Sequence, residues 1–323
     1  MSVIFPKKIN CFISETRCEI KLQNLLDHTS KRIFQIPTVK INQENNYNSF
    51  EIFYKWGCDG SNGQSPYKQI YENPNICSDS DLFMFSIVPL QMHCLDNRND
   101  KVVLWKNNRF SSTRFCRPIM FDFKKETVAT TLLEVKAIEH QIEQMRTSII
   151  FVNGNEISVT HKLVFTMVDG KVCNSMTGTS SQRCYICGST PTQMNNINKL
   201  ITFDINEESM RFGLSTLHAW IRFFECLLHI SYRLEFKRWS VRTTEHKLQL
   251  SKTKKRIQDQ FRMEMGLLVD IVVQGKGNTN DGNTARRFFR NPEKVVKSQE
   301  LTYIYLNDLE IYYQHFPVDT ILT

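Results

Sequence analysis

Alternating apolar and polar positions mark the first half of the chain as rich in strands. Every second residue from Phe50 to Trp56 is apolar, which predicts a strand with one face turned to a core. The glycine at position 57 predicts that this strand ends in a tight turn. Further strands are predicted over residues 82–90, 101–106, 117–123 and 156–169.

Helical spacing of apolar residues appears in four places. The segment 18–34 predicts a short amphipathic helix, because Leu22, Leu25, Leu26 and Ile33 recur near helical spacing. The segment 124–146 carries a longer stripe with charges on its other side. The stripe consists of Val128, Leu132, Val135, Ile138 and Ile142. Two more helices are predicted over 214–234 and 253–270. The apolar face of the first consists of Leu217, Trp220, Ile221, Phe224, Leu227, Leu228 and Ser231.

The order of these elements gives the fold class. Strands, a helix and another strand are followed by a mainly helical region, which predicts a mixed α/β architecture. We expect three parts: an N-terminal helical or linker segment (1–45), an α/β core (46–182), and a basic, mainly helical region that contains the CxxC motif (183–323).

The positive charge of the chain is concentrated in the helical region. The net charge is +8, and residues 211–297 hold 18 Lys and Arg against 8 Asp and Glu. A basic surface of this kind suits a polyanion, of which DNA is the usual one. A solvated helical face explains the charge equally well. The candidate DNA contacts are Lys252, Lys254, Lys255, Arg256, Arg286 and Arg287.

Hydropathy and cysteine content exclude other classes of protein. No apolar run reaches the length of a membrane span, and the first residues lack the apolar core of a signal peptide. Ten cysteines are scattered apart from one close pair, so we expect reduced thiols, with the close pair as a candidate for a metal site.

Two aspartates could hold divalent cations. Asp59 and Asp169 each follow an apolar strand and precede a glycine. Mg²⁺ and Mn²⁺ prefer carboxylate ligands, and a sheet holds strand-end carboxylates in fixed positions. Asp-Gly between apolar runs is also a common hairpin signal, and from these dipeptides alone a turn is the more favoured interpretation.

The close cysteine pair, Cys184 and Cys187, precedes a glycine and has the spacing of half a tetrahedral zinc site. No second pair of ligands is evident, because the histidines after this motif are isolated from one another. For His218 and His229 we expect a place inside an apolar helix as hydrogen-bonded core residues. The other isolated histidines are His246 and His315.

The order of five motifs resembles a known family. GCDGSNGQSPYKQ, STRFCRPI, TMVDGKVCN, CYICG and GNTNDGNTARRFF follow one another as in the catalytic region of the V(D)J recombination-activating recombinase and the Transib transposases. The chain is more similar still to uncharacterised invertebrate recombinase-like proteins. The resemblance implies an RNase H-like core with a mainly helical C-terminal insertion region, incomplete at the C-terminus.

The resemblance also implies roles for single residues. Asp59 and Asp169 match two of the three acids that bind Mg²⁺ or Mn²⁺ in this DDE-type family. Cys184 and Cys187 match the cysteine half of its zinc site. The His pair and the third acid of the family follow the region where this sequence ends.

Three hypotheses result. The first is a fragment of a recombinase or transposase that nicks DNA and transfers strands with two metal ions, inactive by itself. The second is a non-catalytic DNA-binding or dimerising protein, and the third is a folding-defective product without a role. We also expect double-stranded DNA as partner, a possible homodimer and no membrane. The basic cluster at 252–256 favours nuclear location.

Overall fold

The computed structural model of the chain describes residues 11–36, 49–62, 80–95, 101–152, 154–194, 202–213, 216–236, 242–273 and 277–290, with a few short stretches between and after them. The chain divides into two compact units, Met1–Gly213 and Leu214–Thr323. The boundary between the units lies C-terminal to the one expected at 182/183, so the CxxC motif belongs to the N-terminal unit. The three-part naming of domains stays a prediction.

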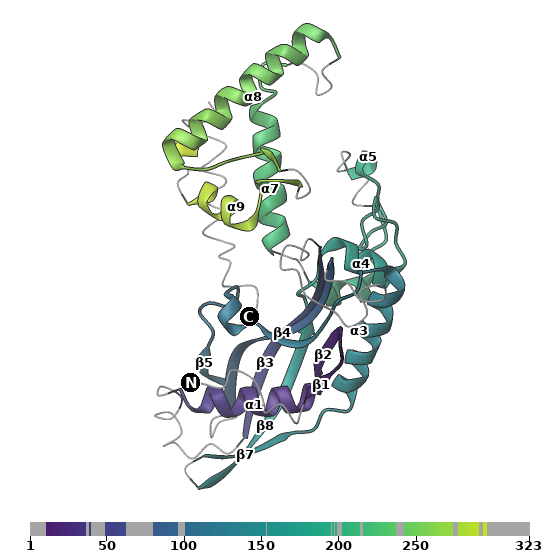
Figure 1. The fold of residues 1–323 in the computed structure, drawn as a ribbon, viewed down its shortest axis with the longest axis vertical. Coiled ribbons are helices and arrows are strands. Elements are labelled where there is room, and N and C mark those ends of the chain that lie inside the picture. Colours follow the sequence, from purple (N-terminus) through teal and green to yellow (C-terminus); the bar gives the residue numbers. More distant parts are fainter. Residues whose placement is uncertain are drawn as a thin grey trace. The chain divides into compact units, whose positions relative to one another are not determined.

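The N-terminal unit is built on an eight-stranded mixed sheet with the order β1-β2-β6-β4-β3-β8-β7, with β5 paired to β4 (Figure 1). Strands β3, β4 and β6 are antiparallel neighbours, whereas β8 runs parallel to β3. The strands are β1 (Cys11–Ile13), β2 (Arg17–Ile20), β3 (Ser49–Asn62), β4 (Asp81–Leu95), β5 (Lys101–Lys106), β6 (Arg117–Asp122), β7 (Ser148–Val152) and β8 (Asn155–Phe165).

Strand β3 confirms the alternation read from the sequence but is longer than predicted. Phe50, Ile52, Tyr54 and Trp56 are all at most 2% exposed. The strand does not end at Gly57, as the sequence suggested, but continues to Asn62. A Cβ at position 57 would lie 1.9 Å from the Met167 carbonyl oxygen. The glycine therefore permits a close approach of two chain segments and does not form a turn.

Two helices supply most of the helical packing of this unit. Four apolar residues of α1 (Leu22–Phe34) are buried as predicted, at Leu22, Leu25, Leu26 and Ile33. Helix α3 (Val128–Glu143) begins at a Thr127 N-cap and buries Val135 and Ile138. Shorter helices are α4 (Gly170–Thr177), α5 (Pro191–Met194), and the 3-10 turns η4 (Thr113–Phe115) and η5 (Glu207–Phe212).

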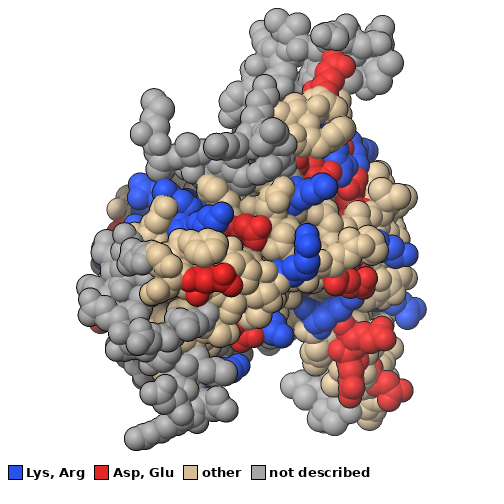
Figure 2. Space-filling view, turned by 90° about the horizontal axis from the view of Figure 1, so that it is seen from below, with Lys and Arg blue, Asp and Glu red and all other residues tan. Residues whose placement is uncertain are grey.

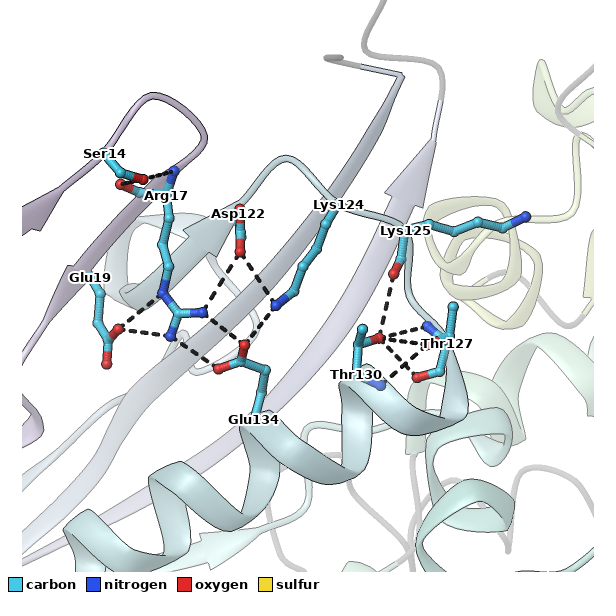
Figure 3. A network of polar contacts seen from close by, with 9 residues as sticks. All are labelled: Ser14, Arg17, Glu19, Asp122, Lys124, Lys125, Thr127, Thr130 and Glu134. Atoms are coloured by element: carbon cyan, nitrogen blue, oxygen red, sulfur yellow. Dashed lines mark hydrogen bonds and ion pairs between the residues drawn. The ribbon is translucent and has the colours of Figure 1, made fainter. Parts of the chain in front are cut away.

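The first turns of α3 depart from the predicted stripe. Val128 is 55% exposed, whereas Glu134 is 4% exposed. The Glu134 carboxylate accepts two hydrogen bonds from the Arg17 guanidinium, at 2.7 and 3.0 Å, and one from Lys124 Nζ at 2.6 Å. Asp122 lies within ion-pair distance of both cations (Figure 3). This network joins β2, β6 and α3, which explains why a carboxylate lies where the helical pattern predicts a solvated one.

The C-terminal unit has a small core of its own. Helix α7 (Thr216–Ser231) contributes Phe224, Leu227 and Leu228 of its predicted face, whereas Leu217 of the same face is 40% exposed. The three buried residues pack with Phe261 and Phe288 of two other helices. The other elements are α8 (Thr244–Met265), α9 (Gly282–Phe289), β9 (Val272–Val273) and β10 (Gly277–Asn278). Of the helices that the structure describes, none has the length and apolarity to cross a membrane.

Candidate functional site

The two predicted aspartates follow the parallel pairing of two neighbouring strands. Strand β3 runs parallel to β8, with Trp56 paired to Phe165. Asp59 lies beyond Trp56 on β3, and Asp169 follows shortly after the end of β8. Because the strands are parallel, their C-terminal ends lie at the same edge of the sheet, and both aspartates are therefore near that edge.

Neither aspartate lies in a hairpin turn, so the turn interpretation of the two Asp-Gly pairs is wrong. Asp59 is exposed and pairs with Met84 inside the β3–β4 ladder. Asp169 is the N-cap of α4, and its carboxylate accepts a hydrogen bond from the Val172 N–H at 2.8 Å. A negative charge at a helix N-terminus is favourable because it satisfies an unpaired N–H and faces the positive end of the helix dipole.

A third carboxylate near this edge was not predicted from the sequence. Glu126 immediately precedes the N-cap of α3. A Cβ at Gly60 would lie 2.5 Å from Glu126 Oε2, so this carboxylate lies against the strand that carries Asp59. Glu126 is 11% exposed at its side chain and pairs with Lys171 Nζ at 2.9 Å. Lys171 in turn lies two positions after Asp169 in α4. An acid directly before a helix-capping threonine was the available signal, but helix starts commonly carry acids.

The electrostatics of Cys58 connect the three acids. The side chain is 3% exposed, and burial raises the pKa of its thiol. The negative charges of Glu126, Asp59 and Asp169 raise that pKa further. All three carboxylates are therefore near enough to the same thiol to act on it, which places them in one region. Cys58 itself is a buried core residue, and its raised pKa makes the thiol unreactive.

The donor chemistry of this region suits a hard divalent cation, because all three side chains offer carboxylate oxygens. Within the described residues, however, no three His, Cys, Asp or Glu side chains come together as a metal-binding group. Glu126 is engaged by Lys171, and one oxygen of Asp169 by the helix N-terminus. The residues fit a divalent metal in type and in region, while the sharing of one ion by Asp59 and Asp169 stays a prediction.

The cysteine pair forms a tight knuckle. The Gly188 N–H donates to the Cys184 carbonyl at 2.8 Å, and Gly188 has a φ of +68°, which favours glycine. The Ser189 hydroxyl lies 3.0 Å from Cys187 Sγ, and hydrogen bonding to Ser189 lowers the pKa of the Cys187 thiol. A thiolate is the form that binds zinc. The zinc half-site stays a prediction, and His315 lies outside the described residues.

Of the two histidines of α7, one lies outside the core in which both were expected. His218 is exposed, so its assignment to the core is wrong, because the first turns of α7 are largely solvent-facing. His229 is half-buried near the Tyr232 ring.

The candidate DNA-contacting residues divide into two groups. Lys252, Lys255 and Arg256 of α8 are exposed. Lys254 is not simply solvent-facing: its Nζ lies 2.6 Å from Asp270 Oδ2 and 5.6 Å from the centre of the Tyr232 ring. The Arg287 side chain donates to the Met265 carbonyl at the end of α8.

Part of the basic surplus in the C-terminal unit therefore stabilises the fold. On other parts of the surface, too, the number of Lys and Arg residues does not locate a binding patch. On the face drawn in Figure 2, Lys and Arg are interspersed with Asp and Glu. Counts of basic residues are thus a weak guide to where a polyanion would bind, and the positions of single side chains must decide.

Comparison with known proteins agrees with the mixed α/β architecture of this unit. Residues 52–182 match the family model described as the recombination-activation protein 1 (RAG1) RNase H domain. The matched segment begins in β3, contains Asp59, Glu126 and Asp169, and ends before the cysteine knuckle. No curated protein matches the chain. The mixed α/β sheet at 52–182 is therefore an RNase H-like domain, and this part of the chain belongs to the RNase H domain family of the recombination-activating recombinase.

Proposed function

We propose that this chain is a fragment or remnant of a DDE-type DNA recombinase or transposase, with Asp59 and Asp169 as two of its metal-binding acids. The observation that supports this most is their place at one edge of the sheet, inside the segment that matches a recombinase RNase H domain. That family acts on DNA and depends on divalent metal, and Mg²⁺ or Mn²⁺ would stabilise the attacking and leaving oxygens of a phosphodiester.

Glu126 is a further candidate ligand in this proposal. Its carboxylate is close to the backbone of β3 beside Asp59 and is held there by Lys171. The ammonium group neutralises Glu126 while no divalent cation is bound, and a cation would have to compete with it. Lys171 is 56% exposed at its side chain, so it can move away into solvent without a rearrangement of the core.

We propose that the chain alone does not cut DNA. Two-metal catalysis needs both ions held at once, and the acids of the described residues do not form a closed group. The candidate third acids Glu300 and Glu310 lie outside the described residues.

The test is a nicking assay on supercoiled duplex DNA with Mg²⁺ or Mn²⁺, with the chain beside Asp59→Asn and Asp169→Asn. We expect no cutting by any of the three proteins, and weak Mn²⁺ binding by the unsubstituted chain alone in a paramagnetic titration. Cutting that either substitution abolishes would contradict the proposed inactivity and support the assignment of the acids. Equal Mn²⁺ binding by all three proteins would contradict the assignment itself.

A second candidate function is non-catalytic binding of double-stranded DNA. It is supported by the exposed cations Lys252, Lys255 and Arg256 on successive turns of α8. Such binding would be weak, independent of sequence and reduced by salt, because it depends on phosphate contacts. Charge reversal at Lys252 and Lys255 should weaken it, and salt-independent binding would contradict it. Nuclear location, a partial zinc site and a homodimer belong to the same proposal.

A further inference from the structure

The sheet of the N-terminal unit has one face on which the long helices pack and one that we call the outer face. Phe34 of α1 contacts Phe50 edge-to-face, with ring centres 5.0 Å apart. Phe50 therefore points toward the helices, as do the alternate residues after it. The intervening residues Glu51, Phe53 and Lys55 point to the outer face.

The registers of the neighbouring strands extend this face. Phe53 pairs with Lys162 on β8 and with Gln91 on β4, and Glu51 pairs with His93. On β5, Val103 lies opposite His93. The same pairing places Lys101, Lys106, Ile149, Phe151, Glu156 and Thr160 on the outer face.

The outer face is basic. Among the described residues it carries Lys55, Lys101, Lys106 and Lys162, against the carboxylates of Glu51 and Glu156. The contacts of Glu51 are loose, since Lys101 Nζ lies at 3.8 Å and Lys162 Nζ at 4.0 Å. Each of these two lysine side chains is 62% exposed, so both can exchange Glu51 for another anion at little cost.

Aromatic rings lie among these cations. Lys101 Nζ lies 5.8 Å from the centre of the Phe53 ring, and that ring is 5.1 Å from the His93 ring. Lys55 Nζ lies 4.9 Å from the centre of the Phe110 ring. At the edge strand β7, Phe151 is 72% exposed, although a solvated phenylalanine brings no benefit to folding.

We infer that the outer face binds single-stranded nucleic acid. Lysines can neutralise the phosphates of a strand while exposed aromatic rings stack on its bases, and this combination is typical of proteins that bind single strands. A duplex offers phosphates but keeps its bases inside the stack, where Phe53 and Phe151 cannot reach them. The surface crosses five strands from β5 to β7, which is roughly 19 Å at the usual strand spacing.

This surface differs in its residues from the two interactions proposed above. Alternation along β3 places Asp59 on the same face, beyond Lys55, but the cations and rings of the surface are not the acids near Cys58. The surface lies in a different unit from α8. If the chain did not bind single strands, the proposals of metal binding and duplex binding would still stand. If either of those proposals failed, the inference of single-strand binding would still stand.

The experiment measures fluorescence anisotropy of a labelled oligodeoxythymidine of about 15 nucleotides, a length in the range of one binding domain. The full chain is compared with Lys101→Glu/Lys162→Glu, with Phe151→Ala and with Lys136→Glu/Lys125→Glu. Phe151 is exposed enough that its removal leaves the core intact. Lys136, on α3, and Lys125, before it, are both exposed and lie outside the outer face, so the last variant controls for net charge.

We expect the outer-face double reversal to weaken binding at least tenfold, and Phe151→Ala to weaken it about tenfold, as for the loss of one stacked base. The control variant should change the affinity for the oligonucleotide less than about threefold, because Lys125 and Lys136 lie outside the face on which the nucleic acid would bind. Equal weakening by the control, unchanged binding by both outer-face variants, or equal competition by duplex DNA or by poly-glutamate would each overturn the inference.

Discussion

The two units of this chain use charged residues in different ways. The N-terminal unit has a net charge of +3 and buries two carboxylates, Asp122 and Glu134, in a network that joins two strands to a helix. The C-terminal unit is about half as long and has a net charge of +5, yet Lys254 and Arg287 contact groups that end or flank α8. The comparison shows that the net charge of a unit differs from the number of charged side chains that are available to bind a partner. A region with many cations can have few that are free to bind a polyanion.

The strongest test of the buried network is Glu134→Ala. It removes the shared partner of Arg17 and Lys124 and leaves two cations facing a core-lining position. Burial works against the ionised carboxylate, but the hydrogen bonds from Arg17 and Lys124 outweigh it and lower the Glu134 pKa. We expect a loss of about 3 kcal/mol in the free energy of unfolding.

The measurement is chemical denaturation followed by circular dichroism. Glu143→Ala on the same helix is the control, because Glu143 is 76% exposed at its side chain and should change stability by less than about 0.5 kcal/mol. Equal effects of the two substitutions would mean that the network contributes no more than an ordinary surface pair.

The second test concerns the pH dependence of the N-terminal unit. Burial lowers the pKa of His161 from 6.5 to about 4, and only the charge of Asp27 acts in the opposite sense. The Ser148 hydroxyl donates to Asp27 and lies 2.7 Å from His161 Nε2, so this oxygen accepts a hydrogen bond from the ring. The Nδ1 atom is buried without a partner in the described structure. A proton added at Nδ1 would therefore be a buried donor with nothing to bind.

The sign of the pH effect follows from the two states. Between pH 6.5 and about 4 the unfolded chain binds a proton at His161 that the folded chain does not, so stability falls as pH falls through this window. The expected loss is about 3 kcal/mol. Denaturation curves at several pH values measure it, with His161→Gln as control. A slope in this window that persists unchanged in the control would assign the effect to other groups.

These cases show what the sequence could and could not predict. The alternation in β3 and the stripe of α1 were sufficient to predict these two elements, because an element with one buried face has a strict period of apolar residues. Strand β7 was not predicted, since its alternate residues Ile149 and Phe151 are apolar but solvent-facing. Buried Glu134 breaks the helical period, and only the distant partner Arg17 explains its place.

The candidate site also has acids that the sequence predicted and one that it did not. The positions of Asp59 and Asp169 after apolar strands, together with the family resemblance, were enough to place both acids at one edge of the sheet. Glu126 could not be found, because its nearness to β3 depends on how α3 packs, and the glycine at position 60 that permits this approach lies in what the sequence predicts as a turn.

A third test concerns the C-terminal unit and separates structural cations from available ones. Lys254→Glu places a carboxylate beside Asp270, whose side chain is only 13% exposed and whose backbone has a φ of +49°. We expect a loss of about 1–2 kcal/mol in stability. Lys255→Glu, on the exposed side of the same helix, should change stability little but weaken duplex DNA binding. Thermal melts and DNA titrations at two salt concentrations measure both quantities. Equal stability of the two variants would place Lys254 among the solvated cations.

The smallest expected effect separates the two roles of Asp169. Its carboxylate caps α4 through the Val172 N–H, and it is also a proposed metal ligand. Asparagine is as good an N-cap as aspartate, whereas alanine cannot accept the hydrogen bond. Asp169→Ala should therefore lower stability by about 1 kcal/mol, and Asp169→Asn by a few tenths at most, which denaturation curves without metal can resolve. In a Mn²⁺ titration both variants should lose affinity, because a neutral amide oxygen is a poorer ligand for a hard cation than a carboxylate. If the Asp169→Asn variant kept the affinity of the unsubstituted chain, capping would be the only role of this residue. The acidic edge of the sheet would then be a feature of the fold alone, as the buried network around Glu134 is.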